Sequence, residues 1–197
     1  MHAAAALANA LANHAPSREA LHVHGGMGAL TALMARTQGV QGAMLEAAMA
    51  IRNGCIGNRD TRQDLADAGG IEVLIKAVSI CGEKVPASLR ERKLQTEENL
   101  AGALRNACNQ HNKNCMQLAE CEGISVLMRL LNGTGSVQEQ VVGLIRNACI
   151  GYHGNKGQMT KCGAYWCMVQ VKSIQPYSLI NVNTWTWHQI LSPYTGW

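Results

Sequence analysis

One short phrase, an aliphatic residue followed by Arg-Asn, occurs three times in this 197-residue chain. The copies are Ile51-Arg52-Asn53, Leu104-Arg105-Asn106 and Ile145-Arg146-Asn147. Counted from each asparagine, residue types also agree without gaps further along. A cysteine lies two residues on, Leu or Met lies 12 and 21 residues on, and Gly or Ala lies 17 residues on. Self-similarity at a fixed spacing indicates that one supersecondary unit is copied in tandem.

The spacing between copies predicts a stacked-helix array. Asn106 and Asn147 are 41 residues apart, and the 53 residues between Asn53 and Asn106 contain an insertion near Cys81–Lys93. A weaker copy ends at Asn13 and aligns if four residues are deleted after it. A unit of about 40 residues with helical spacing cannot bury its apolar face alone, so neighbouring units share one core.

Composition and periodicity predict an all-α fold. Apolar residues make up 47% of the chain, which excludes global disorder. Seven of the eight aromatic residues lie at or beyond Tyr165, so the earlier part builds its core from smaller side chains, which suit close-packed helices. Apolar stripes predict helices ending at Asn53 and covering Ile71–Val78, and Gly69-Gly70 predicts a tight corner between helices.

Two segments depart from the repeat. The insertion contains Gly82, Pro86 and several charges and is predicted to be an exposed loop, with Glu97-Glu98 opening the following helix. The last 34 residues contain one charge, Lys172, and end in a stretch without helical period. We expect an opening helix there, an irregular tail, and apolar ends through which the chain self-associates.

The repeat resembles the armadillo family. The residues that carry the likeness are Gly69-Gly70-Ile71-Glu72-Val73-Leu74, its counterpart Gly123-Ile124-Ser125-Val126-Leu127, and the three Arg-Asn phrases. The resemblance implies a right-handed α-solenoid of about three repeats. The expected units are a partial repeat (1–25), three repeats (26–69, 70–122 and 123–163), and an incomplete repeat with a tail (164–197).

The resemblance also implies a binding site. In armadillo proteins the third helix of each repeat lines a concave groove, and an asparagine on it holds the backbone of an extended peptide; an amide has the donors and acceptor for this. The implied groove residues are Arg52, Asn53, Arg105, Asn106, Arg146 and Asn147, with Asn13 as a weaker member. The tryptophan of nuclear import receptors, four residues before each asparagine, is replaced here by Met49, Gly102 and Gly143, which argues against recognition of a basic signal.

The arginines leave two interpretations open. Guanidinium groups bind carboxylates through paired hydrogen bonds, so a row of them favours an extended acidic segment of another protein. Alternatively, each arginine bridges neighbouring repeats, with its stem covering apolar surface. The asparagines, too, either contact a ligand or tie one repeat to the next.

Other functions are less favoured by the residues. Cys55, Cys108 and Cys149 share one repeat position, which predicts small buried residues rather than a nucleophile, whereas Cys81 is expected to be exposed. The chain has no Cys-x-x-Cys pair, and His22 and His24 lack a carboxylate or thiol partner at suitable spacing, so we expect no metal and no cofactor. A net charge of +4 and repeats without stacking aromatics make nucleic acid an unlikely partner.

The sequence therefore predicts a non-catalytic protein-interaction scaffold in the cytoplasm or nucleus, without a membrane segment. A helical repeat that binds single-stranded nucleic acid is the alternative function, and a thiol-dependent enzyme is less favoured.

Overall fold

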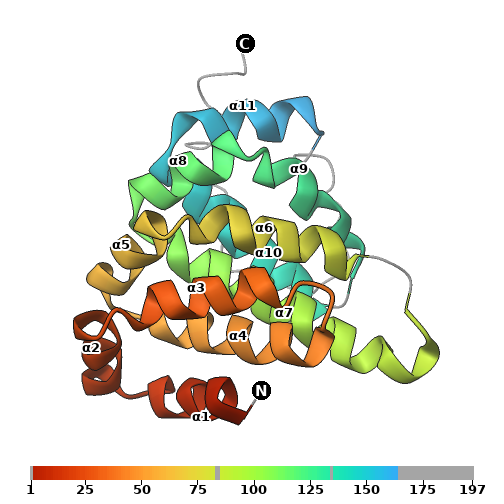
Figure 1. Cartoon of the computed structure of the whole chain (residues 1–197). Coiled ribbons are helices and arrows are strands. Elements are labelled where there is room, and N and C mark those ends of the chain that lie inside the picture. The colour runs from red at the N-terminus through yellow and green to blue at the C-terminus, as the bar shows by residue number, and fades with distance from the viewer. Residues whose placement is uncertain (1, 83–84, 134, 164–197) are drawn as a thin grey trace.

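The computed structural model describes residues 2–82, 85–133 and 135–163, and every regular element in these ranges is helical (Figure 1). The predicted all-α class is confirmed. The helix and irregular tail expected in 164–197 lie outside the described residues.

The helices form three layers, because the equivalent helices of successive repeats pack beside one another. The first-helix layer contains α2 (Ala15–Val23), α5 (Arg59–Asp67), α8 (Asn112–Glu120) and α11 (His153–Lys161). The second-helix layer contains α3 (Gly26–Arg36), α6 (Gly70–Cys81) and α9 (Gly123–Leu127), which continues as the 3-10 helix η2 (Met128–Asn132). The third-helix layer contains α1 (His2–Leu11), α4 (Gln41–Gly54), α7 (Arg90–Ala107) and α10 (Gly135–Gly151).

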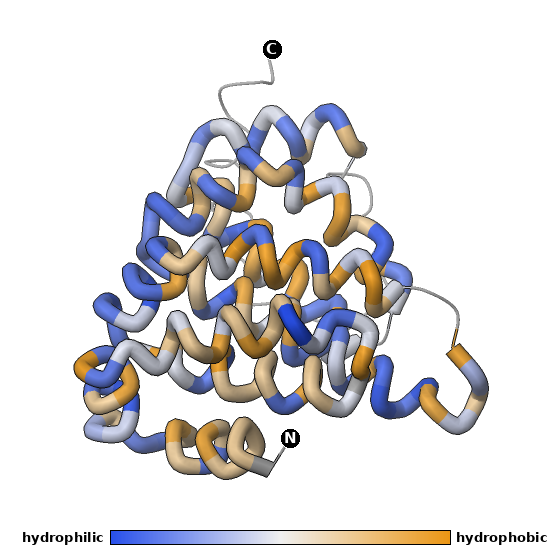
Figure 2. Tube along the Cα trace, in the orientation of Figure 1, coloured by the Kyte–Doolittle hydropathy of each residue, from blue (hydrophilic) through white to orange (hydrophobic). Residues whose placement is uncertain are grey.

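One apolar core runs through the array. It extends from Ala8 in α1 to Met159 in α11 and is built of Ala, Leu, Ile, Val, Met and Cys side chains. Hydrophilic residues gather instead on α5 and on the first part of α7 (Figure 2). Because each repeat shares its buried residues with the next, the array is an all-α solenoid.

The corner between first and second helices depends on glycine. Gly69 has a φ of 67°, which is left-handed backbone that glycine adopts at little cost. At Gly70 a Cβ would lie 2.2 Å from the Cδ1 atom of Leu65, and Gly123 has the same relation to Leu118 at 2.3 Å. These glycines therefore allow the second helix to approach the first.

The insertion is shorter than predicted. Helix α6 continues to Cys81, a short 3-10 turn η1 covers Ala87–Leu89, and α7 begins at Arg90. Residues 90–93 are strong helix formers with no breaker after Pro86, so they extend α7. Glu97 and Glu98 consequently lie within α7 rather than at its start, which corrects the sequence-based expectation.

The first repeat has a different register from the one predicted. Asn13 lies beyond α1 in left-handed backbone, with a φ of 52°. The amide of Asn53 instead bonds to the carbonyl of Ala8, and sister asparagines bond to the carbonyls of Arg52 and Arg105. Asn9 therefore occupies the position of Asn53, and no four-residue deletion is needed.

None of the described helices is both long enough and apolar enough to cross a membrane.

Candidate functional site

The six residues of the Arg-Asn pairs lie on one layer of the molecule. They belong to α4, α7 and α10, which pack in that order, so the pairs form a row. All six side chains are half-buried. We call this row, Arg52, Asn53, Arg105, Asn106, Arg146 and Asn147, the ladder face.

Each ladder asparagine ties its helix to the preceding third helix. The Nδ2 atom of Asn53 donates to the carbonyl of Ala8 at 2.9 Å, that of Asn106 to Arg52 at 3.0 Å, and that of Asn147 to Arg105 at 3.2 Å. The asparagines therefore tie one repeat to the next, which is one of the two roles that the sequence had left open for them.

Part of each amide remains available. Within the described residues, the Oδ1 atoms of Asn53 and Asn106 accept no hydrogen bond, and one N–H of each amide is uncommitted. One acceptor and one donor per residue are what an extended backbone needs for pairing. Joining repeats and contacting a peptide are thus compatible roles for these side chains.

Two of the arginines reach forward to the next third helix. Nη1 of Arg52 lies 3.1 Å from Oδ1 of Asn99 and 3.8 Å from Oε1 of Glu98. Arg105 repeats this arrangement with Gln140 at 3.1 Å and Glu139 at 3.9 Å. These two guanidinium groups bridge repeats and have a carboxylate beside them.

Glycines make room for the two bridging arginines. A Cβ on Gly102 would lie 2.7 Å from Nε of Arg52, and a Cβ on Gly143 would lie 2.6 Å from Nε of Arg105. At the first junction, Ala8 takes the arginine position and Met49 the glycine position. Met49 therefore faces a small residue, whereas a tryptophan in place of Gly102 or Gly143 would collide with the arginine of the preceding repeat.

We expect Gly102 and Arg52 to be energetically coupled. Gly102→Ala alone should change the free energy of unfolding little, because a gain of about 1 kcal/mol in helix propensity is offset by displacement of Arg52. In an Arg52→Ala background the same change should stabilise by about 1 kcal/mol. Urea denaturation of the four proteins of this cycle measures the coupling, and additive effects would contradict it.

Arg146 differs from the other two arginines. Its Nη1 atom lies 3.4 Å from Oδ1 of Asn147 in its own helix, and no carboxylate in the described part of the chain pairs with it. Its positive charge is therefore less compensated than that of Arg52 or Arg105.

A second, buried amide column was missed in the sequence. Asn114 donates to the carbonyls of Ala107 at 2.9 Å and Arg62 at 3.1 Å, and Asn155 makes the equivalent bonds to Ala148 and Cys115. Thr61 keeps one such bond, from Oγ1 to the carbonyl of Gly54 at 2.8 Å. All three stand eight residues after a ladder asparagine, a recurrence that was available in the sequence.

The repeat-equivalent thiols are buried. Cys55, Cys108 and Cys149 are at most 1% exposed, and burial raises the pKa of Cys55 and of Cys149 to about 12. Cys81, expected to be exposed, is 3% exposed because α6 continues to it and α7 covers it. Cys121 and Cys162 are half-buried, and Cys167 lies outside the described residues.

We expect thiol labelling of the native protein to spare the buried set. A protonated, inaccessible thiol is a poor nucleophile, so Cys55, Cys108 and Cys149 should react with a maleimide far more slowly than Cys162. Peptide mass spectrometry after timed labelling gives the rate for each cysteine. Fast modification of all three buried thiols would contradict the packing.

The first-helix layer contains an ionisable link between repeats. Nδ1 of His22 lies 2.8 Å from Oδ2 of Asp64, and this hydrogen bond is the main reason why the pKa of His22 is raised. Asp64, Asp60 and Glu19 add favourable charge, whereas burial opposes the shift.

This link predicts a pH-dependent stability. Because the folded-state pKa is raised, the contribution is present below the ordinary value of 6.5 and is lost as pH rises through the folded-state pKa. The melting-temperature difference between wild type and His22→Gln should therefore be larger at about pH 5.5 than at about pH 8. If this melting-temperature difference does not depend on pH, the link is refuted. The link is also refuted if His22→Gln has the same pH-dependent effect in an Asp64→Asn background.

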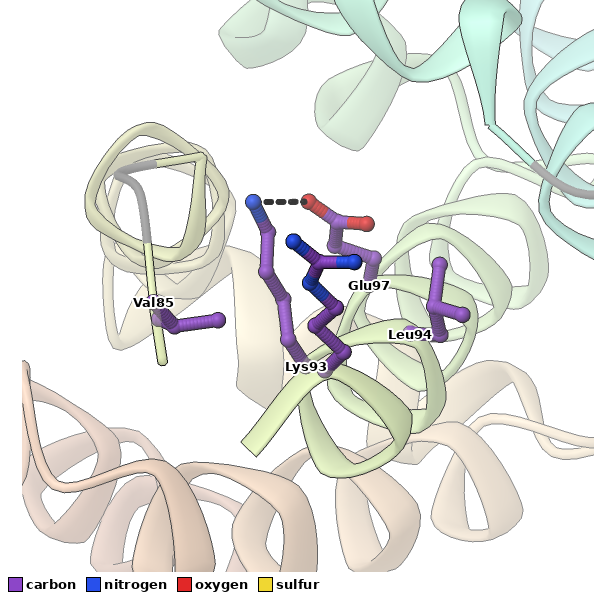
Figure 3. Close-up of a pocket in the computed structure, with 5 residues that line it drawn as sticks. Val85, Lys93, Leu94 and Glu97 are labelled. Carbon is purple, nitrogen blue, oxygen red and sulfur yellow. Dashed lines mark ion pairs between the residues drawn. The ribbon is translucent and has the colours of Figure 1, made fainter. Parts of the chain in front are cut away.

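A pocket of about 560 Å³ lies where the insertion meets α7. Figure 3 shows the ammonium of Lys93 facing the carboxylate of Glu97, at 3.8 Å. Burial raises the pKa of Glu97, while Lys93 and Arg129 act against that shift. Val85, Arg90 and Leu94 complete the lining, and the pocket is separate from the ladder face.

Comparison with solved structures defines the class of the fold. The designed armadillo repeat protein YIII(Dq)4CqI is similar over 96% of this chain and 92% of its own, with a TM-score of 0.52 and 18% identity. An engineered protein, Northeast Structural Genomics Consortium Target OR329, matches 96% of this chain and 86% of its own, with a TM-score of 0.47 and 20% identity. No family model matches the sequence, and no curated protein is significantly similar to it. The similarity to the designed armadillo repeat protein shows that the chain has an armadillo-like helical repeat fold.

Proposed function

We propose that this chain is a non-catalytic protein-interaction scaffold whose ladder face binds an extended peptide segment that contains an acidic residue. The observation that carries the proposal is that the side-chain amides of Asn53 and Asn106 use only part of their hydrogen-bonding capacity. Each half-buried amide has one acceptor and one donor that make no hydrogen bond in the described residues. Amides in a row, one per repeat, suit a ligand whose backbone is itself periodic.

The acidic preference follows from the charges of the same surface. Arg52 and Arg105 have a carboxylate beside them, and Arg146 adds a cation without one in the described residues. An acidic side chain compensates that charge.

The thiols support a scaffold rather than a thiol-dependent enzyme. The described cysteines form no disulfide, and those at the recurring repeat position are buried. Unpaired cysteines suit a reducing compartment, so we propose the cytoplasm or nucleus. Self-association is a further part of the proposal, and sedimentation velocity at several protein concentrations tests it.

Nuclear magnetic resonance of side-chain amides tests the binding surface. Linear peptides would be selected from a random library on the native chain and then titrated into the labelled protein. The amide signals of Asn53 and Asn106 should shift, whereas that of Asn58, which caps α5 in the first-helix layer, should not. Shifts confined to Asn58 and other first-helix residues would overturn the proposal.

A further inference from the structure

The three arginines of the ladder face are chemically unequal. Arg52 and Arg105 each have an amide oxygen at 3.1 Å and a carboxylate oxygen at 3.8 or 3.9 Å on the next third helix. Arg146 has only the side-chain oxygen of Asn147, at 3.4 Å, among the described residues. One sequence phrase therefore produces two different environments.

A ligand carboxylate distinguishes these environments. Near Arg52 it meets Glu98, and near Arg105 it meets Glu139, so attraction to the cation is opposed by repulsion from the anion. Glu139 also belongs to α10, but it lies seven residues before Arg146, about 10 Å along the helix axis. The carboxylate of Glu139 pairs with Arg105 instead, and the backbone rise that separates it from Arg146 is longer than the screening length of about 8 Å at physiological salt.

Donor geometry permits a carboxylate to bind at Arg146. A guanidinium has five N–H donors, and the Arg146 side chain uses one for Asn147. The half-buried side chain keeps its remaining donors for a carboxylate, which guanidinium binds through two parallel hydrogen bonds.

We propose that Arg146 is the specificity-determining residue of the ladder face. It selects a carboxylate side chain, Asp or Glu, at one position of the bound peptide, whereas Arg52 and Arg105 hold repeats together without selecting charge. This inference rests on the proposed peptide-binding function.

Two synthetic nonapeptides test this inference. The probes are acetyl-Gly-Ser-Gly-Ser-Glu-Ser-Gly-Ser-Gly-amide and the same peptide with Gln in place of Glu, titrated into the whole chain. Arginine Nε–H signals and asparagine side-chain signals are followed together. The Glu peptide should bind about fivefold more tightly, as a partly exposed ion pair allows, and should shift the Arg146 signal most.

Matched variants locate the preference. Arg146→Gln should bind both peptides equally and keep the shifts at Asn53 and Asn106. Arg105→Gln should keep the fivefold preference, although it melts at a lower temperature because a bridge between repeats is lost. A preference that survives in Arg146→Gln, or that disappears in Arg105→Gln, would overturn the inference.

The experiment separates this inference from the proposed function. If wild type binds both peptides equally and the Asn53 and Asn106 signals shift, the charge selection is wrong and the peptide-binding surface stands. If neither peptide shifts those asparagine signals at millimolar concentration, the proposed function fails, and this inference fails with it.

Discussion

Asn114→Ala is expected to lower the free energy of unfolding by about 2 to 3 kcal/mol. The side chain is fully buried, and its Nδ2 atom bonds to two carbonyls, one in its own repeat and one in the preceding repeat. The change leaves the carbonyl of Ala107, at the end of α7, without its partner, which costs about 1–3 kcal/mol, and it removes a second hydrogen bond, worth about 0.5–1.5 kcal/mol, to a carbonyl within α5. The loss is reduced because Oδ1 of Asn114 is itself buried without a partner in the described structure, and because alanine favours a helix.

Two matched variants separate this effect from the loss of any asparagine. Asn109→Ala removes the same atoms from an exposed side chain and should change stability by less than about 0.5 kcal/mol. Asn114→Thr should fall between them, because Thr61 shows that threonine keeps one of the two bonds at this repeat position. Urea denaturation gives the three values, and equal effects of Asn114→Ala and Asn109→Ala would contradict the buried column.

Gly70→Ala is expected to destabilise the fold by about 2 kcal/mol. The new Cβ would lie 2.2 Å from Cδ1 of Leu65, which is fully buried, and 3.0 Å from the Leu65 carbonyl oxygen. Since the carbonyl belongs to the backbone, the second helix has to move away from the first, and overpacking of this kind costs about 1–3 kcal/mol.

Gly28→Ala provides a control with the opposite sign. Gly28 also lies early in a second helix, α3, but a Cβ there would meet nothing within 4 Å. The alanine should stabilise by about 0.5 to 1 kcal/mol through helix propensity alone. Thermal and urea unfolding of both variants give the comparison, and two effects of the same sign would show that close helix approach at Gly70 is not what requires glycine.

Much of the fold was predictable because the repeat fixes it. Aligning Asn53, Asn106 and Asn147 places equivalent helices in equivalent positions, and stacking then follows from their shared apolar faces. The six ladder residues lie in a row for the same reason. Whether they bind a peptide stays a prediction.

Other features were not predictable in the same way, because they depend on neighbouring repeats. The first helix and its end contain two asparagines, Asn9 and Asn13, and the sequence pattern favoured Asn13. The hydrogen bond from Asn53 to the carbonyl of Ala8 shows that Asn9 is the residue equivalent to Asn53. The arginine bridges could not be predicted without knowing that Glu98 lies beside Arg52 and that Glu139 lies beside Arg105. Each glutamate stands eight residues before the ladder asparagine of its own helix. Cys81 is buried because α7 begins at Arg90, earlier than Gly82 and Pro86 in the insertion had suggested, and covers it.

Nuclear Overhauser contacts between a selected peptide and the protein test whether the ladder asparagines hold a peptide backbone. Amide protons of the peptide backbone should lie close to the side-chain amide protons of Asn53 and of Asn106, at peptide positions that advance in one direction along the ladder face. Contacts found only with first-helix residues such as Asn58, or no contact with either ladder asparagine in a complex that is otherwise well defined, would show that the ladder face does not bind the peptide.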